Sequence, residues 1–294
     1  MTPDLIDLLA DVPAATARYG VRDDRGHSMD TLKVVESPAG GYLGVYHTLA
    51  DTGFAVHLAT STDLLTWTHR AVLDAPASQP TIAETPGAGF LVVVEAGGSG
   101  QPAWLRFRHY RNLGRLLAGD ADRIFDAPHT QVPPGQLAEG TPNVYATTPV
   151  IDVGFHYFRD GDVDRQARGT LTGFGHWITR REPGIDAAIE AWGVQGNIGD
   201  RDVLPWRGHR YNLQEGQLRK GDWGSWRVFL YAWTDHVAYP VDVRTHGGST
   251  AFGNPTATVL TGPSGEPTLV VTMFLFGEGA APGEAGELVY HRSI

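Results

Sequence analysis

Short apolar runs alternate with polar turns along most of the chain, and only its first residues carry a helical pattern. A short helix is predicted between Pro3 and Pro13, because one helical face collects Leu5, Ile6, Leu8 and Leu9. From about residue 30 onward, β-branched and aromatic runs of strand length are separated by Gly, Pro, Asp and Asn clusters. The first four runs predict an antiparallel meander over residues 31–73: TLKVVES, YLGVYHT, FAVHLATS and WTHRAVL.

The opening hairpin of this meander returns four times. Its later copies are PTIAETPGAGFLVVVE, PNVYATTPVIDVGFHYF, DVLPWRGHRYNLQEGQ and PTATVLTGPSGEPTLVVTMF. The five repeats begin near residues 30, 79, 141, 202 and 254, a period of roughly 50–60 residues with about four strands in each. Such a period predicts an all-β fold, a single five-bladed β-propeller domain over residues 1–294. A β-sandwich, the alternative, would show strands about every 8–12 residues without the longer period.

The fifth repeat is one strand short, because only ELVYHRSI follows its hairpin. The segment ATARYGVR, residues 15–22, is expected to supply the missing strand from the N-terminus and close the ring.

Composition narrows the possible partners. The formal net charge of −10 and pI near 5.6 argue against binding to nucleic acid or to an anionic membrane surface. The chain has no cysteine, which excludes disulfides and thiolate metal sites. The N-terminus lacks the basic region of a signal peptide, and no apolar run approaches the ~18 residues of a membrane span. A cytoplasmic location is expected, although a secreted protein without its signal would look the same.

In a propeller, the loops that lead into the first strand of each blade share one face with the ends of the second strands. The positions predicted to lie nearest the central channel are Asp30, Gln79, Glu139, Asp202 and Asn254. Each one alone fits ordinary turn chemistry, since Asp and Asn hydrogen-bond their own backbone. Five such positions converging on one channel favour a site. Further candidates for substrate contact are His27, His47, Glu95, Arg201, Trp206, Glu215 and His246.

Two carboxylates facing each other across a channel suit glycoside hydrolysis. One, kept protonated, donates to the leaving oxygen, and the other activates water or attacks the sugar. Asp30 and Glu139 belong to the first and third repeats, so a sugar unit has room between them. Together with Asp202 they are the predicted catalytic residues, and aromatic side chains such as Trp206 are candidates for stacking on the sugar.

Two short motifs resemble those of a known family. STDLLTW, residues 61–67, resembles the S-x-D-L-x-x-W signature of the five-bladed glycoside hydrolases, especially family 43, and EGTP, residues 139–142, resembles an E-G-P motif. The resemblance implies that Asp30 is the general base and Glu139 the general acid. Gln79 stands where that family has an Asp that tunes the acid, and a neutral amide cannot act by like-charge repulsion. Asp202, in an Arg201-Asp202 pair, could take the charged role from the fourth repeat.

The same resemblance implies a cation linked to a histidine, for which His246 is the nearest match. The 12 histidines show no metal-binding spacing, so no metal or other cofactor is expected, although a channel Ca²⁺ is conceivable. The expected ligand is a small glycoside or oligosaccharide with an arabinose-, xylose- or galactose-type unit. Two alternatives stay open: a carbohydrate-binding propeller without hydrolysis, and a lyase, isomerase or cyclase acting on a small metabolite.

Overall fold

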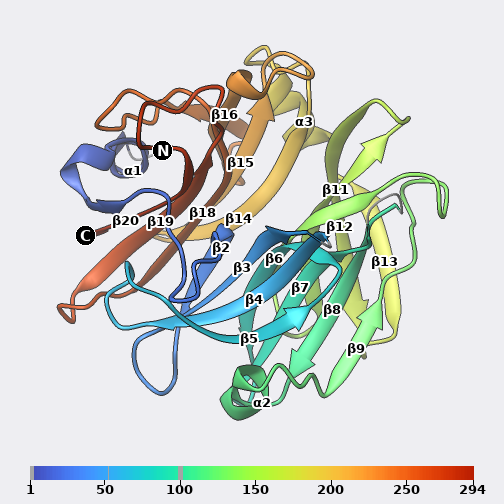
Figure 1. The fold of residues 1–294 in the computed structure, drawn as a ribbon. Coiled ribbons are helices and arrows are strands. Elements are labelled where there is room, and N and C mark those ends of the chain that lie inside the picture. The colour runs from blue at the N-terminus through green and yellow to red at the C-terminus, as the bar shows by residue number, and fades with distance from the viewer. Residues whose placement is uncertain (1–2, 52, 99–101) are drawn as a thin grey trace.

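Five four-stranded antiparallel sheets stand around a central axis, each with its first strand innermost (Figure 1). The structure is a computed structural model that describes residues 3–51, 53–98 and 102–294. The all-β five-bladed propeller predicted from the repeats is confirmed. Among the described residues, no helix is both long enough and apolar enough to cross a membrane.

The blades follow one another in chain order. Blade I contains β2 (Asp30–Glu36), β3 (Tyr42–Ala50), β4 (Gly53–Ser61) and β5 (Thr68–Asp74). Blade II contains β6 (Ala77–Thr85), β7 (Gly89–Ala96), β8 (Trp104–Tyr110) and β9 (Arg123–Asp126). Blade III contains β10 (Glu139–Ala146), β11 (Ile151–Arg159), β12 (Val163–Thr172) and β13 (His176–Arg181). Blade IV contains β14 (Ile198–Trp206), β15 (His209–Gln217), β16 (Trp226–Ala232) and β17 (Val237–Val241).

The fifth blade draws on both ends of the chain. It contains β18 (Phe252–Thr261), β19 (Pro267–Leu275), β20 (Gly286–Ser293) and, outermost, β1 (Thr16–Arg18). The β1–β20 pairing is antiparallel, with Thr16 opposite His291 and Arg18 opposite Val289. A strand from the N-terminus therefore completes the sheet that the C-terminus begins.

Helices are short and sit at the edge of the ring. They are α1 (Pro3–Ala10), α2 (Leu113–Leu117) and α3 (Pro183–Glu190), with 3-10 turns η1 (Val12–Ala14) and η2 (Trp223–Ser225). In α1, Leu5 and Leu9 are fully buried in the cluster formed mainly by blades IV and V. The Tyr290 hydroxyl donates to the Leu9 carbonyl and fixes the helix against β20.

The core consists of apolar layers between neighbouring blades rather than one central mass. Leu43 of blade I and Phe90 of blade II belong to one such layer, and Val93 and Phe155 to the layer between blades II and III. Because each sheet buries both faces against its neighbours, these strands carry apolar residues on both sides. The first strands of the five blades surround the axis, and their polar residues lie there.

The innermost strands share one irregularity. Each has a register shift near its start, between Asp30 and Lys33, Ser78 and Thr81, Gly140 and Asn143, Asp200 and Asp202, and Gly253 and Thr256. In four blades a non-glycine residue inside the bulge has a left-handed backbone, with φ of 60° at Thr31, 50° at Gln79, 52° at Thr141 and 48° at Asn254. Strained residues of this kind are uncommon and collect at functional sites, so four at equivalent positions mark this end of the channel.

Candidate functional site

A cavity of about 350 Å³ opens at the end of the channel where the five bulges lie. Four of the residues predicted to contact substrate line it: Gln79, Glu95, Glu215 and Asn254. The remaining lining residues come from blades III to V and their loops, and they are Ala138, Thr141, His156, Phe158, Asp164, Asn197, Gly199, Trp223, Trp226 and Phe276. The face of the ring predicted from the repeats is therefore the face that carries the cavity.

The second strands reach across to the bulges of the next blade. Glu95 Oε2 accepts the backbone N–H of Thr141 at 3.0 Å, and Glu215 Oε2 accepts that of Asn254. His47 Nδ1 accepts the N–H of Gln79 at 3.0 Å in the same way. In each bulge, one backbone N–H has lost its usual acceptor on the neighbouring strand, and these side chains accept it instead. The same bonds hold the two carboxylates at the cavity wall.

The closing junction, between blades V and I, uses a different residue. Phe274 is the strand-two residue opposite the bulge of blade V, and its cross-strand neighbour Glu287 accepts the N–H of Thr31 at 3.1 Å. Glu287 is buried, and burial together with the nearby Asp30 raises its pKa well above the usual range.

Glycines on the first strands make room for the carboxylates. A Cβ at Gly140 would lie 2.0 Å from Glu95 Oε2, and one at Gly199 would lie 2.4 Å from Glu215 Oε1. A Cβ at Gly253 would lie 2.6 Å from the ring of Phe276. Any larger residue at these three positions would push a cavity-lining side chain aside.

Aromatic rings form the wall on the side of blades IV and V. Phe276 stacks on Trp226 with ring centroids 5.9 Å apart and lies 5.3 Å from Trp223. Trp223 sits in η2, capped by the Asp222 carboxylate on the Gly224 N–H, and its side chain is half exposed. Apolar faces beside carboxylates and amides are suited to a sugar, which presents C–H bonds on one face and hydroxyls at its edge.

A histidine completes the polar side. His156 contacts the Thr141 hydroxyl at 2.8 Å through Nδ1, and its Nε2 lies 3.7 Å from Asp164 Oδ1. Sequence reasoning missed His156, Asp164 and the three aromatic residues. The signal for His156 was its place opposite Gly140, equivalent to Glu95 opposite Ser78 and Glu215 opposite Gly199.

Glu139 does not reach the cavity, which corrects its predicted place at the mouth of the channel. Its side chain is buried, and Oε1 accepts the backbone N–H groups of Thr130, Gln131 and Val132 at 2.7, 2.6 and 3.3 Å. The carboxylate holds the loop that leads into blade III. Because side chains alternate along a strand, the residue beside Gly140 points away from the wall that Glu95 occupies.

Asp202 is also committed elsewhere, in the interior of the channel. It forms a buried ion pair with Lys33 and accepts the Ala257 N–H at 2.8 Å, while Lys33 donates to Thr258 at 2.8 Å. Burial raises the pKa of Asp202, and the Lys33 ammonium opposes that effect. These groups join blades I, IV and V, so the predicted catalytic role of Asp202 does not fit its surroundings.

Asp30 is not among the described residues that line the cavity. It is half-buried, its Oδ2 accepts the Ser28 hydroxyl at 3.0 Å, and burial raises its pKa. His47 is buried behind Gln79, where it also contacts the Thr31 hydroxyl.

The other predicted contacts lie elsewhere. Trp206 is buried in the core against α1, His246 is exposed beside Tyr19, and His27 sits on the rim of blade I. The side chain of Arg201 lies outside the described residues. His246, the candidate for a cation, is not among the described residues that line the cavity.

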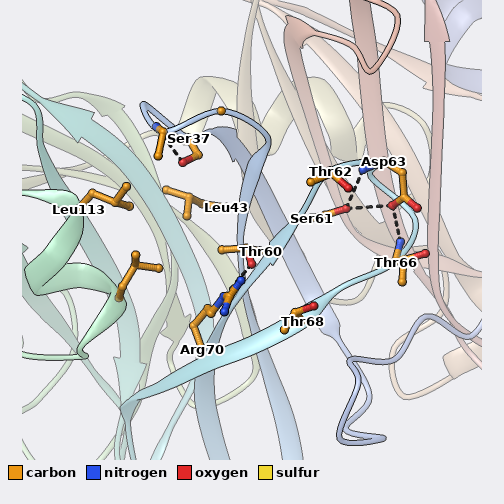
Figure 2. A pocket seen from close by; sticks show the side chains of 13 residues that line it. Ser37, Leu43, Thr60, Ser61, Thr62, Asp63, Thr66, Thr68, Arg70 and Leu113 are labelled. Carbon is orange, nitrogen blue, oxygen red and sulfur yellow. Dashed lines mark hydrogen bonds between the residues drawn. The ribbon is translucent and has the colours of Figure 1, made fainter.

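A larger hollow, of about 760 Å³, lies beside blade I and α2, away from the cavity (Figure 2). The turn formed by the S-x-D-L-x-x-W motif lines part of this hollow. The Asp63 carboxylate accepts the Ser61 hydroxyl at 3.0 Å and the Thr66 N–H at 2.7 Å, and Trp67 is buried. The motif therefore shapes the β4–β5 turn and carries information about the fold.

Comparison with known proteins finds solved structures with the same fold. Neither a protein-family model nor a curated protein matches this sequence. Solved structures do: a thermostable family-43 glycoside hydrolase aligns with a TM-score of 0.61 and 11% identity over 94% of this chain and 92% of its own. An exo-1,5-α-L-arabinanase from a bovine ruminal metagenomic library aligns at 0.60 and 11% over 92% and 94%. The α-L-arabinanase of Penicillium chrysogenum, solved with arabinobiose, aligns at 0.56 and 11% over 95% and 98%.

These likenesses are structural and extend over nearly the whole chain. The resemblance to five-bladed glycoside hydrolases noted in the sequence is confirmed at the level of the fold. At 11% identity these likenesses show the fold alone.

Proposed function

We propose that the protein is a glycoside hydrolase-like enzyme that binds a small glycoside in the central cavity, with Glu95 and Glu215 as the carboxylate pair. The observation that carries this proposal is that both carboxylates line one cavity with a wall of aromatic rings. They come from blades II and IV, and the cavity of about 350 Å³ that both line is the space available for a sugar unit. The solved relatives with arabinanase activity suggest an arabinose-type unit, with xylose- and galactose-type units as the nearest alternatives.

The roles follow from the chemistry of glycosidic bonds. One carboxyl group would protonate the leaving oxygen while the other activates water or attacks the anomeric carbon. Gln79, Asn197 and Asn254 offer amides for sugar hydroxyls, and Trp223 or Phe276 a face for the ring.

Turnover of nitrophenyl arabinosides, xylosides and galactosides by the wild type and by Glu95→Gln and Glu215→Gln tests the proposal. Gln keeps an oxygen for the backbone N–H that each carboxylate accepts, so the wall should persist while proton transfer fails. We expect kcat to fall about 10²–10⁴-fold in each variant. Glu139→Gln, a buried carboxylate outside the cavity, is the matched control and should keep kcat within a few-fold. If both cavity variants turn over substrate at the wild-type rate, the assignment is refuted.

A second candidate is a carbohydrate-binding propeller without hydrolysis. It is favoured by Gln79, an amide that lines the cavity where the resemblance calls for an acid, and by the placement of Glu139 outside it. Calorimetric titration with the same sugars separates the two. One bound sugar per chain, lost in Trp223→Ala but accompanied by no cleavage in the panel, would establish binding alone.

A further inference from the structure

Three histidines distant in sequence converge on the outer part of blade I. His57 lies on β4, His69 on β5, and His27 in the segment that connects β1 to β2. One ring nitrogen from each lies within 4.8 Å of the others. None of the three lines the central cavity, so this cluster is separate from the site proposed above. Because the three histidines come from a loop and two strands, they have no regular spacing along the chain, and the sequence alone does not indicate the cluster.

Two of the rings face each other without completing their hydrogen bonds. His57 Nδ1 and His69 Nε2 are 3.1 Å apart, and both side chains are more than nine-tenths buried. Their other nitrogens, His57 Nε2 and His69 Nδ1, are buried and find no hydrogen-bond partner among the described residues. Whichever ring donates in the shared contact, one outward nitrogen keeps a lone pair with no donor and the other keeps an N–H with no acceptor. The shared hydrogen bond therefore uses only one of the two lone pairs that the facing nitrogens can offer to a cation between them.

The third ring is held as a metal ligand would be. His27 Nδ1 lies 2.9 Å from Asp23 Oδ2, which also accepts the Tyr46 hydroxyl at 2.6 Å. The Asp23 carboxylate therefore accepts the Nδ1–H of His27, which leaves Nε2 of that ring with a lone pair. A carboxylate behind a histidine is the usual second contact at metal sites.

The charged groups around the cluster also suit a cation. The charged groups that influence the two rings are Asp23, Asp24 and Arg25. They sum to one negative charge, which favours a cation.

We propose that His27, His57 and His69 form a binding site for a divalent transition-metal ion of the Zn²⁺ class, with water as the fourth ligand. The 3.1 Å separation of the two facing nitrogens approaches the about 3.3 Å between ligand atoms of a tetrahedral site with 2.0–2.1 Å bonds. Imidazole nitrogen selects Zn²⁺, Ni²⁺ or Cu²⁺ over Ca²⁺ or Mg²⁺. The His27 side chain is 37% exposed and leaves a path for the ion.

The bound ion would act as a clip at the closure of the ring. The connection from β1 to β2 passes from blade V into blade I, and it already contacts blade I through Asp24, which accepts the His69 N–H at 2.8 Å. A metal shared by His27 and the two strand histidines would fix this connection just before Asp30.

Titration of the tag-free, chelator-treated chain with Co²⁺ tests the site directly. We expect the visible absorption of tetrahedral cobalt, saturating at one ion per chain, and its displacement by Zn²⁺. His27→Ala changes the partly exposed ligand and should keep the fold while weakening binding at least about tenfold, and Asp23→Asn should weaken it about 10–100-fold. His176→Ala, an exposed histidine on β13, is the matched control and should bind as the wild type does.

Thermal unfolding gives a second readout that needs no enzymatic activity. Zn²⁺ should raise the unfolding temperature of the wild type and of His176→Ala, and raise it much less in His27→Ala. Absence of a tetrahedral cobalt spectrum in the wild type, or a spectrum and affinity unchanged in His27→Ala, would overturn the proposal.

Discussion

Replacing Glu139 by Ala should unfold the loop into blade III without disturbing the cavity. Oε1 of Glu139 accepts three backbone N–H groups, from Thr130, Gln131 and Val132, and the side chain is 2% exposed. Hydrogen bonds to a charged acceptor contribute about 1.5–3 kcal/mol each. Thr130 is exposed and Gln131 only half-buried, so water can replace part of the loss in the variant.

We therefore expect Glu139→Ala to lower the free energy of unfolding by about 3 kcal/mol. At about 2 °C per kcal/mol for a chain of this size, the unfolding temperature should fall by roughly 6 °C. Glu139→Gln keeps one oxygen for the same donors but loses the charge, and should fall by about half as much. Limited proteolysis should show faster cleavage within residues 128–138 in Glu139→Ala.

The measurements are thermal and denaturant unfolding, combined with sugar binding by calorimetry on the same protein samples. Affinity should stay within about threefold of wild type, because Glu139 is not among the lining residues. A Glu139→Ala protein that unfolds at the wild-type temperature but has lost turnover would refute this reasoning and return Glu139 to the role of proton donor.

Three further substitutions test other parts of the structure. Lys33→Met leaves the Asp202 carboxylate buried without its partner and should lower the free energy of unfolding, measured by chemical denaturation, by about 3–5 kcal/mol. Most of this loss should be recovered when Asp202 is also replaced by an apolar residue. Gly140→Ala places a Cβ 2.0 Å from Glu95 Oε2 and should weaken sugar binding at least about tenfold in calorimetry, a result that unchanged affinity would contradict. Burial raises the pKa of Asp186 to about 7, so its contribution to stability is complete below about pH 4 and is lost as the pH rises to about 7. In denaturant titrations, the free energy of unfolding of Asp186→Asn should rise relative to that of the wild type by up to about 4 kcal/mol between pH 4 and pH 8. If the stability of both proteins changes with pH in the same way, this role of Asp186 is excluded.

The fold was predictable because five repeats independently report the same period. The first strands begin at Asp30, Ala77, Glu139, Ile198 and Phe252, against predicted starts near 30, 79, 141, 202 and 254. Four of the five strands start earlier than expected because the segment before the bulge already pairs with strand two. The bulge contains turn-type residues such as Gln79 and Pro80, so in the sequence it resembles the loop that precedes a strand.

The face of the site was predictable, but the direction of individual side chains was not. Gln79 and Asn254 lie in the bulges and line the cavity as expected. Glu139 precedes its bulge and Asp202 follows one, so each points away from the cavity. One extra residue reverses the alternation of a strand, and its position within a loop cannot be fixed from a single sequence. Trp223 and Phe276 were missed for another reason, since nothing in the sequence separates them from core aromatics.

The carboxylates of the cavity also hold the ring together, which decides how variants must be interpreted. Glu95 ties blade II to the bulge of blade III, and Glu215 ties blade IV to that of blade V. An alanine at either position removes both a chemical group and an inter-blade hydrogen bond, so lost activity alone would not reveal which was needed. Gln preserves an acceptor for the backbone N–H and removes only the acid–base function. A catalytic carboxylate should therefore lose kcat in the Gln variant at nearly unchanged unfolding temperature, whereas a purely structural one should retain kcat in the Gln variant and lose stability in the Ala variant.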